Sequence, residues 1–326
     1  MRELKITMLG ATGVGKTSLL AAIYDQFQDN LGRANFQLTP DGASGAKLEE
    51  RLKELQNLPD RFETKGWTPR TQGSKSYTFE LGKKGANPSL KLHFVDYPGE
   101  WHESKASDEN QKKVEDFLRE SVAVIIAIDT PALMEKPEGK DKIGKWHKEV
   151  NTIAAIKELF ERVYRNLSSP KLVILAPVRC EKYVQDEKKA AELLRRVKDG
   201  YSNLINHFSS ETLLTKVAVV VTPVQTVGNV WFSRIDKDEN GKPKFMFTKT
   251  RDKTKYSPKD SEQPLRYLLR FLLKLHIRER EWGMFNFLRD FFSLDNDLKN
   301  AISEFAKGCK NTDGFAVLQG ESLLNM

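Results

Sequence analysis

One stretch near the start of the chain matches G-x-x-x-x-G-K-[ST], the pattern of a loop that binds phosphate groups. Its residues are Gly10, Ala11, Thr12, Gly13, Val14, Gly15, Lys16 and Thr17. Glycines let backbone N–H groups approach a phosphate chain, the lysine ammonium reaches the β- and γ-phosphates, and the threonine hydroxyl ligates Mg²⁺. We therefore predict that these residues, with Ser18 after them, bind the phosphates of a nucleotide, and that Lys16 stabilises phosphate charge during reaction.

The segments on both sides of this loop fit such a site. Residues 4–9 alternate like a strand and end on apolar side chains, and residues 18–24 begin a helix without glycine or proline. A loop that joins a strand to a helix directs backbone N–H groups and the positive end of the helix toward an anion. This context separates the stretch from an ordinary glycine-rich turn.

A second stretch with a chemical role is Asp96-Tyr97-Pro98-Gly99, which has the form D-x-x-G and follows the apolar strand at 89–95. We predict that Asp96 holds Mg²⁺ opposite the loop and that the Gly99 N–H reaches the γ-phosphate. Glu100 comes next and could orient an attacking water, with His102 as a further candidate. The alternative, in which Glu100 only begins an exposed segment, is equally open.

The elements that must position these residues alternate between apolar strands and helices. Apolar runs at 122–128, 171–176 and 216–221 predict strands buried on both faces, and 75–81 with 89–95 predict an antiparallel hairpin. Helices are expected at 108–120, 146–167, 187–208 and 262–280. The expected fold is α/β, a P-loop nucleotidase with a mostly parallel sheet flanked by helices and one antiparallel hairpin edge. Ligands would collect at the carboxyl ends of the strands.

The predicted domain covers residues 1–280 and carries three additions: an inserted helix at about 43–58, a mobile loop at about 135–145 and a hairpin at about 229–250. The hairpin turn at Asp236–Gly241 begins like a calcium loop, but Phe247 stands where a glutamate ligand is needed, so we predict a simple turn. Residues 281–326 are expected to form a C-terminal helical extension. Its aromatic residues, which include Phe285, Phe287, Phe291 and Phe292, either pack on the core or dock a partner.

The phosphate loop and D-x-x-G resemble those of P-loop GTPases of the Ras-like, translation-factor-related (TRAFAC) class, over roughly residues 2–228. The resemblance implies GTP and GDP as ligands, Mg²⁺ as cofactor, slow hydrolysis of the γ-phosphate and a switch that acts through a protein partner. It also implies a switch threonine that meets Mg²⁺ and the γ-phosphate. Thr71 is our choice for it and Thr68 the second. Arg70 could supply in cis the arginine that such proteins often take from a partner.

The base-recognition run departs from that class, which has N/T-K-x-D after the strand that ends here near Ala176. This chain has Val178-Arg179-Cys180-Glu181 instead. By the resemblance, Arg179 would stack on the base and Glu181 would accept hydrogen bonds from the guanine N1–H and exocyclic amine. GTP is therefore favoured, and ATP is not excluded.

A closer resemblance, to bacterial double-GTPase-type and YcjX-like proteins, is carried by residues 96–101 and 257–265. It implies a second GTPase chain as partner and a role in a defence or stress system. Two other functions are open: a nucleotide-binding adaptor or scaffold without turnover, and an ATPase of a multi-protein complex.

Composition limits the remaining possibilities. The net charge of +8 permits nucleic-acid binding, but acidic residues are interspersed among the lysines, which favours an ordinary charged surface. No apolar run reaches about 18 residues, so no transmembrane helix is expected. The first strand begins almost at once, which leaves no room for a signal peptide, and two cysteines are too few for a disulfide framework. We therefore expect a cytoplasmic protein.

Overall fold

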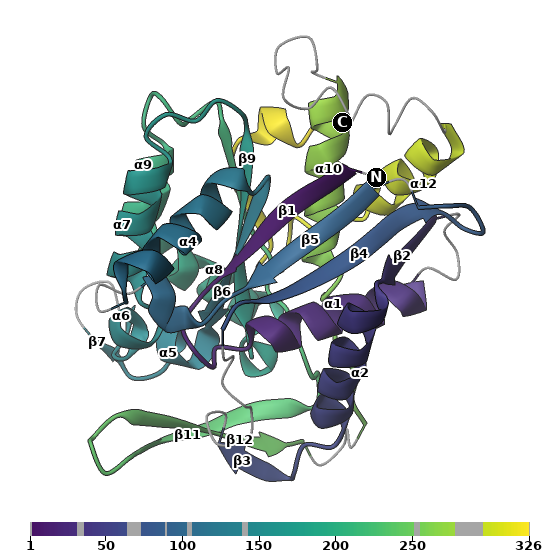
Figure 1. The fold of residues 1–326 in the computed structure, drawn as a ribbon. Coiled ribbons are helices and arrows are strands. Elements are labelled where there is room, and N and C mark those ends of the chain that lie inside the picture. The colour runs from purple at the N-terminus through teal and green to yellow at the C-terminus, as the bar shows by residue number, and fades with distance from the viewer. Residues whose placement is uncertain are drawn as a thin grey trace.

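The computed structural model describes residues 2–30, 36–63, 73–88, 90–102, 106–138, 143–250, 255–277 and 296–325. Within them, a central eight-stranded sheet has the order β13-β10-β9-β6-β1-β5-β4-β2 (Figure 1). Its strands are β1 (Arg2–Leu9), β2 (Phe36–Pro40), β4 (Lys75–Lys83), β5 (Leu90–Asp96), β6 (Ala123–Asp129), β9 (Lys171–Val178), β10 (Val217–Val221) and β13 (Ala316–Gln319).

The sheet is parallel at its centre and antiparallel at its edges. The strands from β10 through β9, β6 and β1 to β5 pair in parallel. At one edge β4 and β2 are antiparallel, and at the other β13 runs antiparallel to β10. The predicted α/β class and the predicted hairpin edge are confirmed.

Helices cover both faces of this sheet because its central strands are apolar throughout: every residue of β6, β9 and β10 is buried. In Figure 1, α4 lies in front of the sheet and α10 behind it. The helices are α1 (Lys16–Asn30), α2 (Gly42–Gln56), α4 (Asp108–Glu120), α5 (Thr130–Met134), α6 (His147–Val150), α7 (Ile153–Val163), α8 (Glu187–Gly200), α9 (Ser202–Phe208), α10 (Gln263–Ile277) and α12 (Asn296–Lys307).

A smaller antiparallel sheet lies below α1 and α2 in Figure 1. It consists of β11 (Val230–Lys237), β12 (Pro243–Lys249) and β3 (Arg61–Glu63). The predicted hairpin at 229–250 is the β11–β12 pair, and at its turn Asp238 Oδ1 accepts N–H bonds from Asn240 and Lys242. The pairing of β3 with β12 was not predicted. It stacks Phe62 on Phe247, with ring centroids 5.8 Å apart.

Two helix predictions were wrong in extent. The expected helix at 146–167 is divided into α6 and α7, because Thr152 adopts a left-handed conformation with φ of 47°. Asn151 explains the break: its side chain accepts the Asp129 N–H and donates to the Asp129 carbonyl, which fixes the chain against the end of β6. The expected helix at 187–208 is likewise divided into α8 and α9 at Tyr201.

The two other predicted additions can also be compared with the described residues. The inserted helix is α2, which begins at its N-cap Asp41. The segment at 135–145 contains the short pair β7 (Pro137–Glu138) and β8 (Ile143–Gly144), and its mobility remains a prediction.

The C-terminal region contributes to the main core. Phe305 of α12 contacts Phe27 and Phe36, with ring centroids 5.3 and 5.6 Å apart, and β13 adds a strand to the central sheet. The aromatic residues at 285–292 lie outside the described residues. The boundary at residue 280 therefore remains a prediction.

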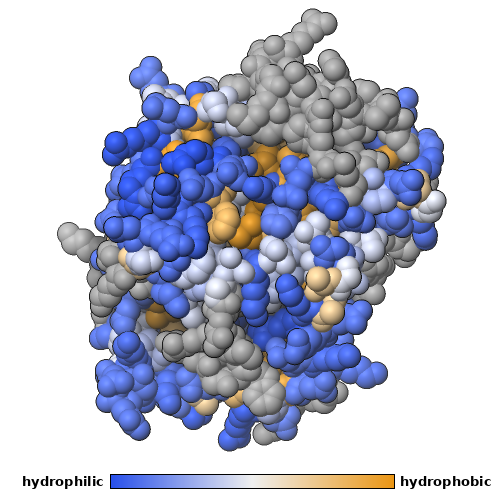
Figure 2. Space-filling model, in the orientation of Figure 1, coloured by the Kyte–Doolittle hydropathy of each residue, from blue (hydrophilic) through white to orange (hydrophobic). Residues whose placement is uncertain are grey.

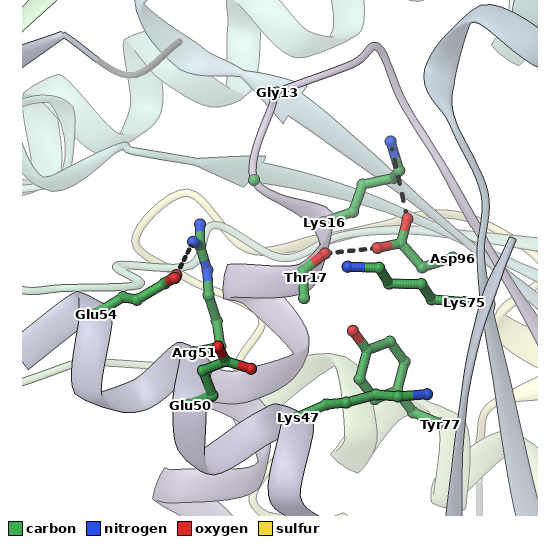
Figure 3. Close-up of a pocket in the computed structure, with 11 residues that line it drawn as sticks. Gly13, Lys16, Thr17, Lys47, Glu50, Arg51, Glu54, Lys75, Tyr77 and Asp96 are labelled. Carbon is green, nitrogen blue, oxygen red and sulfur yellow. Dashed lines mark hydrogen bonds and ion pairs between the residues drawn. The ribbon is translucent and has the colours of Figure 1, made fainter. Parts of the chain in front are cut away.

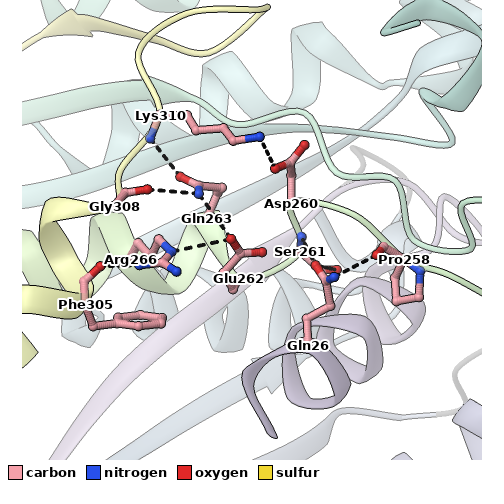
Figure 4. Close-up of polar contacts among 10 residues, drawn as sticks. All are labelled: Gln26, Pro258, Asp260, Ser261, Glu262, Gln263, Arg266, Phe305, Gly308 and Lys310. Atoms are coloured by element: carbon pink, nitrogen blue, oxygen red, sulfur yellow. Dashed lines mark hydrogen bonds and ion pairs between the residues drawn. The ribbon is translucent and has the colours of Figure 1, made fainter. Parts of the chain in front are cut away.

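A partly buried polar network joins α1, the start of α10 and the segment after α12 (Figure 4). Gln26 donates to the Pro258 carbonyl at 2.7 Å and accepts from Ser261 at 3.0 Å. Gln263 donates to the Gly308 carbonyl at 3.1 Å and accepts from the Lys310 N–H at 2.9 Å. The segment at 257–265, which carries the closer resemblance, is thus the junction of these elements.

The surface shown in Figure 2 is mostly hydrophilic, with small apolar areas between the polar side chains. Among the described residues, no helix has the length and apolar character needed to cross a membrane.

Substitution of Gln263 should destabilise the protein. Gln263→Ala removes three hydrogen bonds made by a side chain that is 2% exposed, to the Gly308 carbonyl, the Lys310 N–H and Glu262 Oε1, at a cost of about 2 kcal/mol. We expect a lower urea midpoint, and at least as large a loss for Gln263→Glu, because its carboxylate would face Glu262 Oε1 and the Gly308 carbonyl, which both accept hydrogen bonds from the Gln263 amide. Lys274→Ala on the same helix is the control and should change stability by less than about 0.5 kcal/mol. Equal midpoints for Gln263→Ala and Lys274→Ala would contradict this account.

Candidate phosphate and base site

The predicted phosphate loop joins the carboxyl end of β1 to α1, with the ends of β5 and β6 on either side. Its glycines have backbone conformations that other residues rarely adopt: φ is 136° at Gly10, 78° at Gly13 and 112° at Gly15. At Gly10 a Cβ atom would also lie 2.8 Å from the Ala127 carbonyl oxygen. The loop conformation therefore requires glycine at these positions.

Lys16 is folded back over the loop. Its Nζ donates to the carbonyls of Gly10 at 2.9 Å and Ala11 at 3.3 Å, and it lies 3.9 Å from Asp96 Oδ1. Burial lowers the pKa of Lys16, while the Asp96 and Glu100 carboxylates oppose this shift. The ammonium is therefore held by weak acceptors in a place where a phosphate would be a stronger partner.

Thr17 and Asp96 present oxygen atoms suited to a magnesium ion. Thr17 Oγ1 donates to Asp96 Oδ2 at 2.6 Å, and Asp96 Oδ1, which is buried, has no hydrogen-bond partner in the described part of the chain. Burial raises the pKa of Asp96, and Lys16 and Thr17 oppose this shift. Hydroxyl and carboxylate oxygens are the ligands that Mg²⁺ prefers, so the pair fits the ion.

A magnesium ion at this pair would need further ligands besides Thr17 and Asp96, because Mg²⁺ prefers six. The described residues contain no group of three or more His, Cys, Asp or Glu side chains arranged to hold a metal. Phosphate and water oxygens usually complete such sites.

The D-x-x-G turn packs directly on the phosphate loop. A Cβ atom on Gly99 would lie 2.2 Å from the Thr12 nitrogen and 2.4 Å from the Ala11 carbonyl carbon. Thr12 Oγ1 also donates to Glu100 Oε2 at 2.7 Å. Gly99 and Glu100 thus lie against the loop, and only glycine fits at position 99.

A pocket of about 270 Å³ lies beside the loop (Figure 3). Its lining comes from the loop and Asp96, from α2 and from β4: Gly13, Gly15, Lys16, Thr17, Asp96, Lys47, Glu50, Arg51, Glu54, Lys75 and Tyr77. We refer to it as the phosphate pocket.

The lining residues from α2 and β4 were not predicted from the sequence. The signal was present in α2, where residues 47, 50, 51 and 54 recur at intervals of three and four and therefore share one helix face.

A second, mainly apolar pocket adjoins the first and shares Gly15 and Arg51 with it. Its apolar walls come from the loop, from α2 and the segment after it, from β9, from the segment before β11 and from the small sheet: Val14, Leu55, Leu58, Phe62, Val178, Val227, Val230 and Phe247. Its polar lining residues are Ser18, Arg51, Arg179, Glu181 and Thr226. We refer to it as the base pocket.

Arg179 connects the base pocket to the phosphate loop. Its guanidinium forms an ion pair with Asp129 Oδ2 at 2.5 Å and donates through Nη2 to the Gly13 carbonyl. It also lies 5.9 Å from the centre of the Phe247 ring. The side chain is therefore fixed between the loop, the end of β6 and the small sheet.

Glu181 is a buried carboxylate at the base pocket, 5% exposed. Its Oε1 accepts the N–H groups of Val227 at 3.2 Å and Gly228 at 3.3 Å. Burial raises the pKa of Glu181, whereas these backbone hydrogen bonds and the charge of Arg179 oppose the shift. The Ser257 N–H donates to the Val227 carbonyl at 3.0 Å, which helps to fix the segment that carries these two N–H donors.

The structure brings most of the predicted site residues together. The loop residues, Ser18, Asp96, Gly99, Glu100, Arg179 and Glu181 line the two pockets or pack on the loop. Thr71, Thr68 and Arg70 lie outside the described residues, as does the side chain of His102. Their roles remain predictions.

Comparison with known proteins gave one family and a set of distant structures. The sequence model of the Double-GTPase 2 family matches residues 5–223. No curated protein matched the chain.

Two of the similar structures are of the GTPase-like domain of Ski7 from S. cerevisiae. The GTP-bound form is 16% identical with a TM-score of 0.37, and the form with GDP and inorganic phosphate is 15% identical with a TM-score of 0.35. The alignments cover 68% of this chain in both cases and 42% and 43% of the Ski7 chains, so less than half the length of those chains is matched.

The family match spans two thirds of the sequence and includes the phosphate loop, Asp96, Gly99 and Glu181. The chain therefore belongs to the Double-GTPase 2 family, in agreement with the predicted resemblance.

Proposed function

We propose that this protein is a Mg²⁺-dependent GTP-binding switch that hydrolyses GTP slowly. The observation that carries the proposal is the continuity of the two pockets. The phosphate pocket, with a lysine, a threonine and an aspartate, opens beside an apolar pocket that a buried carboxylate lines. A nucleoside triphosphate has the same division into an anionic and a mainly apolar part.

The phosphate end of the nucleotide would lie on the loop. Lys16 would exchange the Gly10 and Ala11 carbonyls for β- and γ-phosphate oxygens, and the N-terminus of α1 would add its positive partial charge. Thr17 and Asp96 would hold Mg²⁺, which when bound supplies charge neutralisation between the phosphates. Thr71 remains our prediction for the switch threonine that completes this end.

The base end favours guanine through Glu181. An ionised carboxylate only accepts hydrogen bonds, and guanine presents two donors on one edge, N1–H and the exocyclic amine. Adenine presents an acceptor at N1, which would face the carboxylate unfavourably. The Val227 and Gly228 N–H groups use part of the acceptor capacity of Glu181 and fix its position, while Phe247 and Arg179 provide flat surfaces beside the base.

Hydrolysis would require a group that orients water at the γ-phosphate, and Glu100 is our candidate. Its carboxylate lies at the loop through the hydrogen bond from Thr12, and it can accept a proton or hydrogen bond from water. The alternative of a nucleotide-binding scaffold without turnover uses the same pockets and differs only in this step.

The biological setting follows from the resemblance alone. A second GTPase chain as partner and a bacterial defence or stress role are part of the proposal. A cytoplasmic location is also proposed, on the grounds of the chain's composition. An ATPase of a larger complex is the competing proposal, and base selectivity separates the two.

Lys16→Ala should weaken GTP binding about 10- to 100-fold, because it removes a charge-assisted contact to the phosphates. Isothermal titration calorimetry with GTP and Mg²⁺ measures the effect. Lys189→Ala, at an exposed position of α8, is the control and should leave the affinity unchanged. An unchanged dissociation constant for Lys16→Ala would exclude the phosphate loop as the binding site.

Glu181→Gln should weaken GTP binding at least about tenfold. Its amide N–H groups would face the N1–H and exocyclic amine of guanine, so that donors would meet donors. Xanthosine triphosphate carries a carbonyl in place of the amine, so its affinity should rise relative to that of GTP. Competition between the two nucleotides gives the ratio, and Glu187→Gln on exposed α8 is the control. A ratio that stays the same in Glu181→Gln would remove Glu181 from base recognition.

Gly99→Ala should lower GTP turnover at least about tenfold, because the added methyl group displaces the D-x-x-G turn from the loop. Phosphate release under saturating GTP measures turnover. Gly42→Ala is the matched control, since a Cβ at Gly42 meets no atom within 4 Å. Full turnover in Gly99→Ala would show that this contact has no part in hydrolysis.

A further inference from the structure

Arg51, on the inserted helix α2, is the one side chain that lines both pockets in the described part of the chain. The other shared residue, Gly15, has no side chain. Figure 3 shows the Arg51 side chain extending from α2 toward the phosphate loop. It therefore stands where the phosphate chain of a bound nucleotide would meet the nucleoside.

The guanidinium of Arg51 is fixed in place but retains donors. Nε and Nη2 donate to Ser18 Oγ at 3.2 and 2.7 Å, and Nη1 forms an ion pair with Glu54. An arginine has five N–H donors, so one on each terminal nitrogen is left after these contacts. The side chain is only 10% exposed, which limits competition from water.

The sequence of α2 explains why Arg51 faces the site. Leu48, Leu52 and Leu55 are buried and hold one face of the helix against the core, and α2 packs along α1. Residues 47, 51 and 54 lie on the adjoining face and line the phosphate pocket. The direction of Arg51 is thus set by the packing of the helix and does not depend on a loop.

We propose that Arg51 binds the α-phosphate of the nucleotide, an inference that rests on the proposed function. Ser18, its hydroxyl partner, directly follows Thr17 in the first turn of α1, where backbone N–H groups cradle the α- and β-phosphates. Lys16 serves the outer phosphates, and Arg51 approaches from the side of the base pocket. The planar guanidinium suits two non-bridging phosphate oxygens, and Glu54 keeps it oriented.

A purely structural role for Arg51 is the alternative. In that case the Ser18 and Glu54 contacts would only join α2 to α1, and substitution would change the stability of the nucleotide-free protein. It would not produce a loss of affinity that depends on which phosphates the ligand carries.

The test is the calorimetric affinity of the chain of residues 1–326 for GTP, GDP, GMP and guanosine, with Mg²⁺. Arg51→Ala should weaken GTP, GDP and GMP binding by a similar factor of about 10 to 100 and leave guanosine binding unchanged. Arg51→Lys keeps the charge and should recover part of the loss, and it also serves if Arg51→Ala folds poorly. Lys53→Ala, exposed on the same helix, is the matched control and should bind like the wild type.

The possible results separate this inference from the proposed function. A loss confined to GTP would place Arg51 at the γ-phosphate and overturn the α-phosphate assignment. Wild-type affinities in Arg51→Ala, or an equal loss for guanosine, would also overturn it but would leave the proposed function standing. A wild-type protein that binds no guanine nucleotide would overturn the proposed function, and this inference with it.

Discussion

The close contact between the phosphate loop and the D-x-x-G turn is the constraint on which the site depends. Gly99 leaves no space for a Cβ atom against Thr12 and Ala11, and a few residues earlier Asp96 reaches Thr17 and Lys16. Because β1 and β5 are neighbouring parallel strands, their carboxyl ends deliver the two segments to the same edge of the sheet. The chemistry of the pocket is therefore a consequence of strand order.

Additions to this core enclose the rest of the site. Helix α2 forms one wall of the phosphate pocket, and the small sheet of β11, β12 and β3 closes the base pocket with Phe62 and Phe247. Arg179 links the small sheet to the phosphate loop, because it bonds Gly13 and Asp129 and lies near Phe247. The segment at 257–265 supports the strand-end loop that positions Glu181, and through Gln26 it also contacts α1. The same C-terminal junction therefore contacts both the loop at the base pocket and the helix that follows the phosphate loop.

The features that depend on local sequence patterns could be predicted. The loop has a defined spacing, the buried strands are continuous apolar runs, and Asn240-Gly241 is strong turn chemistry, so the sheet class and the hairpin could be predicted. Prediction failed where contacts between segments distant in the sequence determine where a helix ends or which strands pair. Asn151 ends a helix by bonding Asp129, and β3 pairs with β12 across more than 180 residues. Arg51 was missed because its role depends on the place of α2 in space, although the spacing within α2 was visible.

The central claim is that the connected pockets select a guanine nucleotide. Calorimetric titration of the wild-type protein with GTP, GDP and ATP, each with Mg²⁺, tests it most directly. The account predicts that GTP and GDP bind and that ATP binds at least about 100-fold more weakly, since adenine cannot donate to Glu181 from N1. ATP affinity equal to or greater than that of GTP would contradict it.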